Sequence, residues 1–139
     1  MSDRHLVIHT DGGARGNPGP AALGVVIESD GQIIKTIGEY LGEATNNQAE
    51  YQAVHAALFF AVEHGATSVD LYSDSELIVK QLRGEYKVKN KELGPWFLKV
   101  HELANKIGRV RWFSIPREEN TAADAQVNQA LDEATSQQM

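Results

Sequence analysis

Hydrophobic and polar positions change their spacing several times along the chain, and each change marks a predicted element. Residues 4–10 are a largely apolar run that is typical of a buried strand. Two further apolar segments, 21–29 and 32–41, flank Asp30–Gly31, and this dipeptide between apolar runs is a strong hairpin signal. We therefore expect three antiparallel strands at the start of the chain. Residues 11–20 hold four glycines and two prolines, which predicts a loop.

After the third predicted strand, the apolar residues have the spacing that is typical of a helix. Small and apolar residues recur at this spacing up to position 61, and Gly65 is expected to end the helix. Asn46 or Asn47 is the expected cap, with Glu50 completing a capping box three residues after Asn47. The remaining predicted elements are a strand at 67–73, a short helix at 75–83, an irregular segment at 85–95, a helix at 96–107, a strand at 109–115 and a helix at 121–134.

This order, βββαβααβα, predicts an α/β fold with a five-stranded mixed sheet flanked by helices. The fourth and fifth strands are joined through helices, so we expect them to run parallel to the first strand. The length of 139 residues suits one domain, and we expect residues 1–139 to form it, with residues 135–139 as a frayed tail.

Composition narrows the possible partners and locations. The chain has no cysteine, which excludes disulfides and thiolate metal sites and fits a reducing cytoplasm. No segment reaches the roughly 18 apolar residues that a membrane span requires, and residues 1–30 do not resemble a signal peptide. We therefore expect a cytoplasmic protein without a membrane partner. Nothing in the sequence demands an oligomer, so a monomer is expected.

Charge gives two opposite indications about nucleic acids. The net charge of −6 argues against nonspecific binding, because contacts with phosphates need cations. Five of the 13 basic residues nevertheless lie within 12 positions, and they are Lys80, Arg83, Lys87, Lys89 and Lys91. Such a cluster can follow a phosphate backbone, or it can be solvated surface. Charge alone leaves both interpretations open.

Four acidic residues stand at the ends of predicted elements. Asp11 and Asp74 follow the first and fourth strands, and open α/β sheets place their sites at the carboxyl ends of such strands. Glu50 and Asp124 lie in the first turns of two helices, where each alone is explained by the helix dipole. If the four converge, their repulsion calls for a divalent cation, and oxygen ligands suit Mg²⁺ or Mn²⁺ rather than zinc. Two such ions about 4 Å apart would catalyse phosphoryl transfer.

Four motifs in order resemble type 1 ribonuclease H. The similarity covers nearly the whole chain, from about residue 5 to about residue 132. The motifs are Thr10–Gly13 followed by Gly16–Pro20, Thr45–Glu50, Tyr72–Ser75, and Pro116–Asn120 with Asp124 and Asn128. Each motif is short, but their order and spacing together are highly specific.

This resemblance implies the RNase H-like fold and an endonuclease that hydrolyses the RNA strand of RNA/DNA hybrids. The implied products carry 5′-phosphate and 3′-hydroxyl ends, and the implied cofactor is a pair of Mg²⁺ ions, with Mn²⁺ as a possible substitute. By position, the catalytic and metal-binding residues are Asp11, Glu50, Asp74 and Asp124. The residues implied to bind the RNA strand and its 2′-hydroxyls are Gly12, Gly13, Asn17 and Asn47, and those implied to bind a DNA phosphate are Thr45 and Asn46.

Two departures from the commonest family pattern bear on how substrate is held. The loop before the last motif has Arg117 and no histidine. An arginine stays protonated, so we expect it to hold the scissile phosphate or assist product release rather than act as a base. Residues 84–95 form a short connection where other members carry a long basic protrusion, and Lys87 and Lys89 are expected to grip the hybrid weakly. Short-handled members resemble archaeal enzymes, some of which also cut double-stranded RNA.

Two other functions remain to be weighed. The same fold could be a catalytically silent module that binds hybrids, but the intact acidic quartet argues against it. A related nuclease of the wider superfamily could act on another duplex, yet those proteins do not combine the Asn46–Asn47 and Gly16–Pro20 motifs.

Overall fold

The predicted order of elements is confirmed in the computed structural model, which describes residues 4–137. Residues 138–139 of the predicted frayed tail lie outside the described residues, and residues 135–137 belong to the last helix. The elements are β1 His5–Ala14, β2 Gly19–Ser29, β3 Gln32–Ala44, α1 Asn46–Glu63, β4 Ser68–Ser73, α2 Glu76–Leu82, α3 Gly94–Ile107, β5 Arg109–Ser114, the 3₁₀ turn η1 Arg117–Glu119 and α4 Thr121–Gln137.

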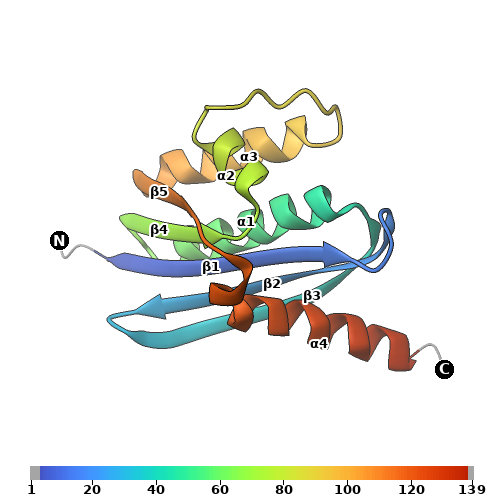
Figure 1. The fold of residues 1–139 in the computed structure, drawn as a ribbon. Helices are drawn as coiled ribbons and strands as arrows, with labels where there is room; N and C mark the ends of the chain where they lie inside the picture. Colours follow the sequence, from blue (N-terminus) through green and yellow to red (C-terminus); the bar gives the residue numbers. More distant parts are fainter. Residues whose placement is uncertain (1–3, 138–139) are drawn as a thin grey trace.

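The five strands form one mixed sheet in the order β3-β2-β1-β4-β5. The first three strands pair antiparallel, whereas β4 pairs parallel with both β1 and β5, as the connections predicted. Helices α1, α2 and α3 lie on one side of the sheet and α4 lies on the other (Figure 1). Side chains alternate accordingly: Val25 and Ile27 of β2 join the main core beneath α1, and Ala22 packs with Val127 of α4.

The predicted loop at residues 11–20 is wrong over most of its length. β1 continues through Asp11 to Ala14, and β2 already begins at Gly19, so the turn spans only residues 15–18. The glycines of β1 have a packing role instead. A Cβ on Gly12 would lie 2.3 Å from the carbonyl carbon of Ala49, so only glycine lets β1 approach the start of α1 this closely.

The predicted cap of α1 is also wrong, because Thr45 holds that position. The Thr45 hydroxyl accepts a hydrogen bond from the backbone N–H of Gln48 at 3.1 Å, and the Gln48 side chain accepts one from the Thr45 N–H at 2.8 Å. This reciprocal pair is a capping box, displaced by two residues from the predicted one. Glu50 is thereby left free of any capping role. The predicted end is confirmed, since α1 stops at Glu63 and Gly65 follows with a positive φ of 77°.

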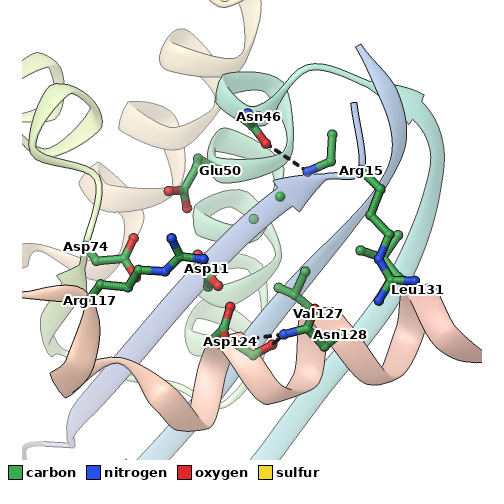
Figure 2. Close-up of a pocket in the computed structure, with 13 residues that line it drawn as sticks. Asp11, Arg15, Asn46, Glu50, Asp74, Arg117, Asp124, Val127, Asn128 and Leu131 are labelled. Atoms are coloured by element: carbon green, nitrogen blue, oxygen red, sulfur yellow. Dashed lines mark hydrogen bonds between the residues drawn. The ribbon is translucent and has the colours of Figure 1, made fainter. Parts of the chain in front are cut away.

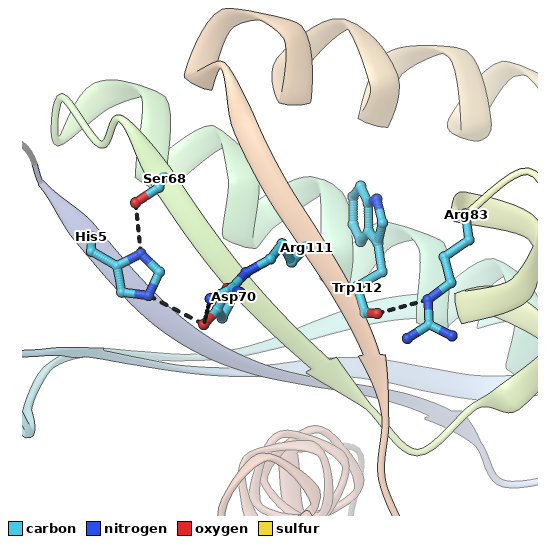
Figure 3. Close-up of polar contacts among 6 residues, drawn as sticks. All are labelled: His5, Ser68, Asp70, Arg83, Arg111 and Trp112. Atoms are coloured by element: carbon cyan, nitrogen blue, oxygen red, sulfur yellow. Dashed lines mark hydrogen bonds and ion pairs between the residues drawn. The ribbon is translucent and has the colours of Figure 1, made fainter.

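Polar contacts stabilise the pairing of β4 with the edge strand β5 (Figure 3). Arg111 of β5 donates two hydrogen bonds, of 2.7 and 2.8 Å, to the carboxylate of Asp70, its neighbour on β4. Burial alone would raise the pKa of Asp70, but Arg111 and His5 hold it below its usual value. On the edge strand, the Arg83 Nε donates to the Trp112 carbonyl at 2.8 Å. Arg83, one member of the predicted basic cluster, therefore has a structural contact that secures the sheet edge.

Helix α4 lies unusually close to the strands that it covers. A Cβ on Gly24, in the middle of β2, would stand 2.2 Å from the carbonyl oxygen of Ala123. A Cβ on Gly38 of β3 would stand 3.0 Å from the carbonyl oxygen of Gln126. Because these two glycines have no side chain, the first turns of α4 can pack directly against the backbone of β2 and β3. Within residues 4–137, no helix is long and apolar enough to cross a membrane.

We predict that Gly24→Ala destabilises the protein by about 1–3 kcal/mol, because the new methyl group overpacks the contact with α4. The free energy of unfolding in urea measures this change. Gly94→Ala is the matched control, since a Cβ there meets nothing within 4 Å, and its effect is expected to stay within about 0.5 kcal/mol. Equal stability of the two variants would contradict the proposed contact.

Candidate metal centre

The four predicted acidic residues come together in one open cleft (Figure 2). Asp11 lies in β1, and Asp74 directly follows the parallel strand β4. Glu50 lies near the start of α1, and Asp124 in the first turn of α4, so the two helices reach the cleft from opposite faces of the sheet. The cleft has a volume of about 490 Å³.

Three of these carboxylates meet at a single point. One oxygen each from Asp11, Glu50 and Asp74 lie within 4.8 Å of one another. Asp124 lies outside this trio but beside Asp11, and its Oδ2 accepts a hydrogen bond from the Asn128 side chain at 3.2 Å. The sequence therefore predicted all four residues of the cluster, although the structure distinguishes a tight trio from a fourth, adjacent acid.

Burial and mutual repulsion perturb the two innermost acids. Asp11 is only 8% exposed, and burial, followed by the negative charges of Asp74 and Asp124, raises its pKa to about 7. The backbone N–H of Gly12 partly offsets this rise. Burial, followed by the charges of Asp11 and Asp74, also raises the pKa of Glu50 well above its usual value. In the metal-free protein, both groups therefore hold their protons to a higher pH than an ordinary carboxyl group does.

The cluster has the properties of a cation site. Its donors are all carboxylate oxygens, the ligands that Mg²⁺ and Mn²⁺ prefer. The Glu50 Oε1 is buried and has no hydrogen-bond partner among the described residues. A buried polar atom normally has a partner, and a cation would supply one. The residues present thus fit a divalent metal ion.

Asn120 is a site residue that sequence reasoning did not identify. It is 1% exposed, and its side-chain amide donates to the Thr10 carbonyl at 2.9 Å and to the Asp74 Oδ2 at 3.1 Å. It therefore joins the segment before α4 to β1 and orients one carboxylate of the trio. An asparagine just before a helix ordinarily indicates a cap, so its position in the sequence did not reveal this second role.

The predicted substrate residues near the carboxylates have two kinds of position. Gly12, Gly13, Asn46 and Arg117 line the cleft. Thr45 and Asn17 form the junction at the start of α1: Thr45 caps the helix, and the Asn17 side chain accepts from the Asn46 N–H at 3.0 Å. The Asn46 side chain in turn accepts from the Ala14 N–H at 2.8 Å. Asn47 is half-buried in the first turn of the same helix.

The basic segment lies apart from the cleft. Lys87 and Lys89 are exposed between α2 and α3, where Lys87 lines a separate apolar groove with Tyr86 and Phe97. Lys80, another member of the predicted cluster, is paired with Glu76 at 2.8 Å. The structure therefore does not bring these lysines to the carboxylates. Among the described residues that line the cleft, Arg117 stands in the loop before the last motif and none is a histidine.

Comparisons with known proteins show what this chain is similar to. Residues 9–130 match the family described as reverse transcriptase-like. A ribonuclease HI of Halobacterium salinarum is 42% identical over 135 residues, which cover 95% of this chain and 68% of that protein. A bifunctional protein of Mycobacterium tuberculosis is 40% identical over 131 residues, or 93% of this chain. The chain spans only 36% of that mycobacterial relative.

A solved structure shows the same fold with nucleic acid bound. The crystal structure of LC11-RNase H1 in complex with an RNA/DNA hybrid matches this chain with a TM-score of 0.90 at 43% sequence identity. The match covers 94% of this chain and 99% of that one. Similarity in sequence and in structure thus extends over nearly the whole of both chains.

The raised pKa of Asp11 predicts how stability depends on pH. Folding raises this pKa from its ordinary value of 3.8 to about 7, so the ionised form opposes folding and the metal-free protein loses stability as pH rises across that interval. Asp11→Asn removes this cost. We expect the variant to exceed the wild type in free energy of unfolding by about 1–3 kcal/mol at about pH 8, with the difference vanishing near pH 4.

Urea unfolding in EDTA across this pH range measures the difference. Glu133→Gln, which removes an exposed charge from α4, serves as the control and should leave the pH dependence of the wild type unchanged. A variant that is less stable than the wild type at about pH 8 would show that Asp11 is not held in a repulsive, buried setting.

Proposed function

The chain belongs to the type 1 ribonuclease H family, and we propose that it is an endonuclease that hydrolyses the RNA strand of RNA/DNA hybrids to give 5′-phosphate and 3′-hydroxyl ends. The observation that carries this proposal is the trio of carboxylates within 4.8 Å of one another, at the point where β4 ends beside β1. The name of the halobacterial relative and the hybrid bound to LC11-RNase H1 support the choice of substrate.

Membership of the family and the carboxylate cluster indicate that the protein uses divalent metal ions. We take these to be two Mg²⁺ ions, with Mn²⁺ as a substitute, held by Asp11, Glu50, Asp74 and Asp124. Bound ions of this kind supply an activated water and neutralise charge at the scissile phosphate. Asp11 and Glu50 release their protons as the site fills, and Asn120 keeps one oxygen of Asp74 directed into the cluster.

Residues around the cluster hold the substrate in this proposal. Arg117 lies beside Asp74 at one side of the cleft (Figure 2), where its guanidinium can hold the scissile phosphate and release it with the product. The backbone of Gly12 and Gly13, with Asn47 nearby, contacts the RNA strand and its 2′-hydroxyls, which distinguish RNA from DNA.

The DNA strand has two further contacts. The start of α1, with Thr45 and Asn46, offers amide donors to a DNA phosphate, while Asn17 holds Asn46 in place. Lys87 and Lys89, which are exposed outside the cleft, add attraction that weakens with salt. We take the enzyme to act as a monomer in the cytoplasm, in keeping with its lack of cysteine.

Cleavage of one labelled RNA, presented as hybrid, as double-stranded RNA and as single strand, tests the proposal. We expect the wild type to cut the hybrid with Mg²⁺ or Mn²⁺ and to lose all activity in EDTA. Asp11→Asn, purified in the same way, should lower the rate by at least about 100-fold and so exclude a contaminating nuclease.

The other outcomes separate the alternatives. Binding of the hybrid without cleavage would identify a catalytically silent module. Preferential cutting of double-stranded RNA would identify a related nuclease with another duplex as substrate. Activity that persists in EDTA would refute the metal-dependent mechanism.

A further inference from the structure

Arg15 is a second cation in the cleft, on the side opposite Arg117. It directly follows β1, and its side chain runs toward α4 beside Leu131, whereas Arg117 lies next to Asp74 (Figure 2). Among the described residues that line this cleft, Arg15 and Arg117 are the only cations, and they flank four acids. Positive charges at the two sides of such a negative cleft attract a polyanionic strand and help to hold it there.

The Arg15 guanidinium already has a carboxylate partner in the structure. One of its terminal nitrogens lies 2.7 Å from the Asp132 Oδ1, which belongs to α4. Both side chains are well exposed, Arg15 at 46% and Asp132 at 68%. Exposed ion pairs contribute only about 0.2–1 kcal/mol, so a phosphate can displace this partner at little cost. Arginine binds carboxylates and phosphates in the same planar geometry.

We propose that Arg15 binds a backbone phosphate of the RNA strand and that Asp132 occupies this guanidinium until substrate arrives, as an internal competitor. This inference rests on the proposed function. Arg15 lies four residues beyond Asp11, or about 13 Å along an extended chain, so it reaches a phosphate next to the scissile one rather than the scissile one itself. Arg117 and Arg15 then hold the strand at two points on either side of the carboxylates.

A purely structural role for the pair makes the opposite prediction. If Arg15 and Asp132 serve only to fasten the turn after β1 to α4, removal of Asp132 loosens the cleft wall and weakens substrate binding. If Asp132 competes with the substrate, its removal strengthens binding. The sign of the change in affinity therefore distinguishes the two roles.

The test compares kcat and KM for a hybrid substrate in Mg²⁺ at several salt concentrations. Asp132→Asn should lower KM about two- to five-fold, the range that corresponds to the worth of an exposed ion pair, with the change in KM rather than in kcat. Arg15→Ala should raise KM at least about five-fold and reduce the slope of log KM against log salt by about one. In the Arg15→Ala background, Asp132→Asn should lose its effect.

Glu133→Gln is the matched control, because it removes the same charge from the next position of α4 without touching Arg15. If Glu133→Gln lowers KM as much as Asp132→Asn, the lower KM results from the loss of any negative charge on α4, and the inference is overturned. It is also overturned if the wild type cuts the hybrid and Arg15→Ala leaves KM and the salt slope unchanged. If the wild type does not cut the hybrid at all, the proposed function is overturned together with this inference. Failure of the inference alone is thereby distinguished from failure of the proposed function.

Discussion

Repulsion among buried carboxylates is the constraint on which the arrangement of this protein depends. Asp11, Glu50 and Asp74 meet within 4.8 Å, and the first two are less than a tenth exposed. Gathering such groups is costly unless their charge is neutralised. In the metal-free state, protons retained by Asp11 and Glu50 and the amide of Asn120 relieve part of this cost. The Glu50 Oε1 has no hydrogen-bond partner among the described residues, so part of the cost of burying these carboxylates remains. A bound cation would remove it.

The scaffold satisfies this constraint by close contact between backbones. Gly12 lets β1 approach the start of α1, and Gly24 lets β2 approach the start of α4. These contacts bring Glu50 and Asp124 from opposite faces of the sheet to Asp11, beside the end of β4. A larger side chain at Gly12 or Gly24 would push the helix away from the sheet. These two glycines are therefore structural parts of the site, although they carry no reactive group. The close packing of α1 and α4 on the sheet therefore determines where Glu50 and Asp124 lie in the acidic cluster.

Much of this could be predicted from the sequence. Spacing of apolar residues located the strands and helices. The acids at the ends of these elements, together with the four ordered motifs that contain them, identified the cluster. The errors have physical causes. Glycines at 12 and 13 suggested a turn, but close packing on α1 explains Gly12. The roles of Asn120 and Arg15 depend on partners far away in the chain, at Thr10 and Asp132, which no local pattern shows. The lysines at 87 and 89 formed a suggestive charge cluster, yet the fold places them outside the cleft.

The central claim is that the acidic cluster exchanges protons for a divalent cation, and calorimetric titration with Mg²⁺ tests it most directly. Titration in two buffers that differ in ionisation enthalpy gives the number of protons released on binding. The account predicts release of at least about one proton per chain at about pH 6, with fewer protons released as the pH rises above the pKa of Asp11 of about 7. Binding of Mg²⁺ without proton release at the lower pH, or release that does not depend on pH, would contradict it.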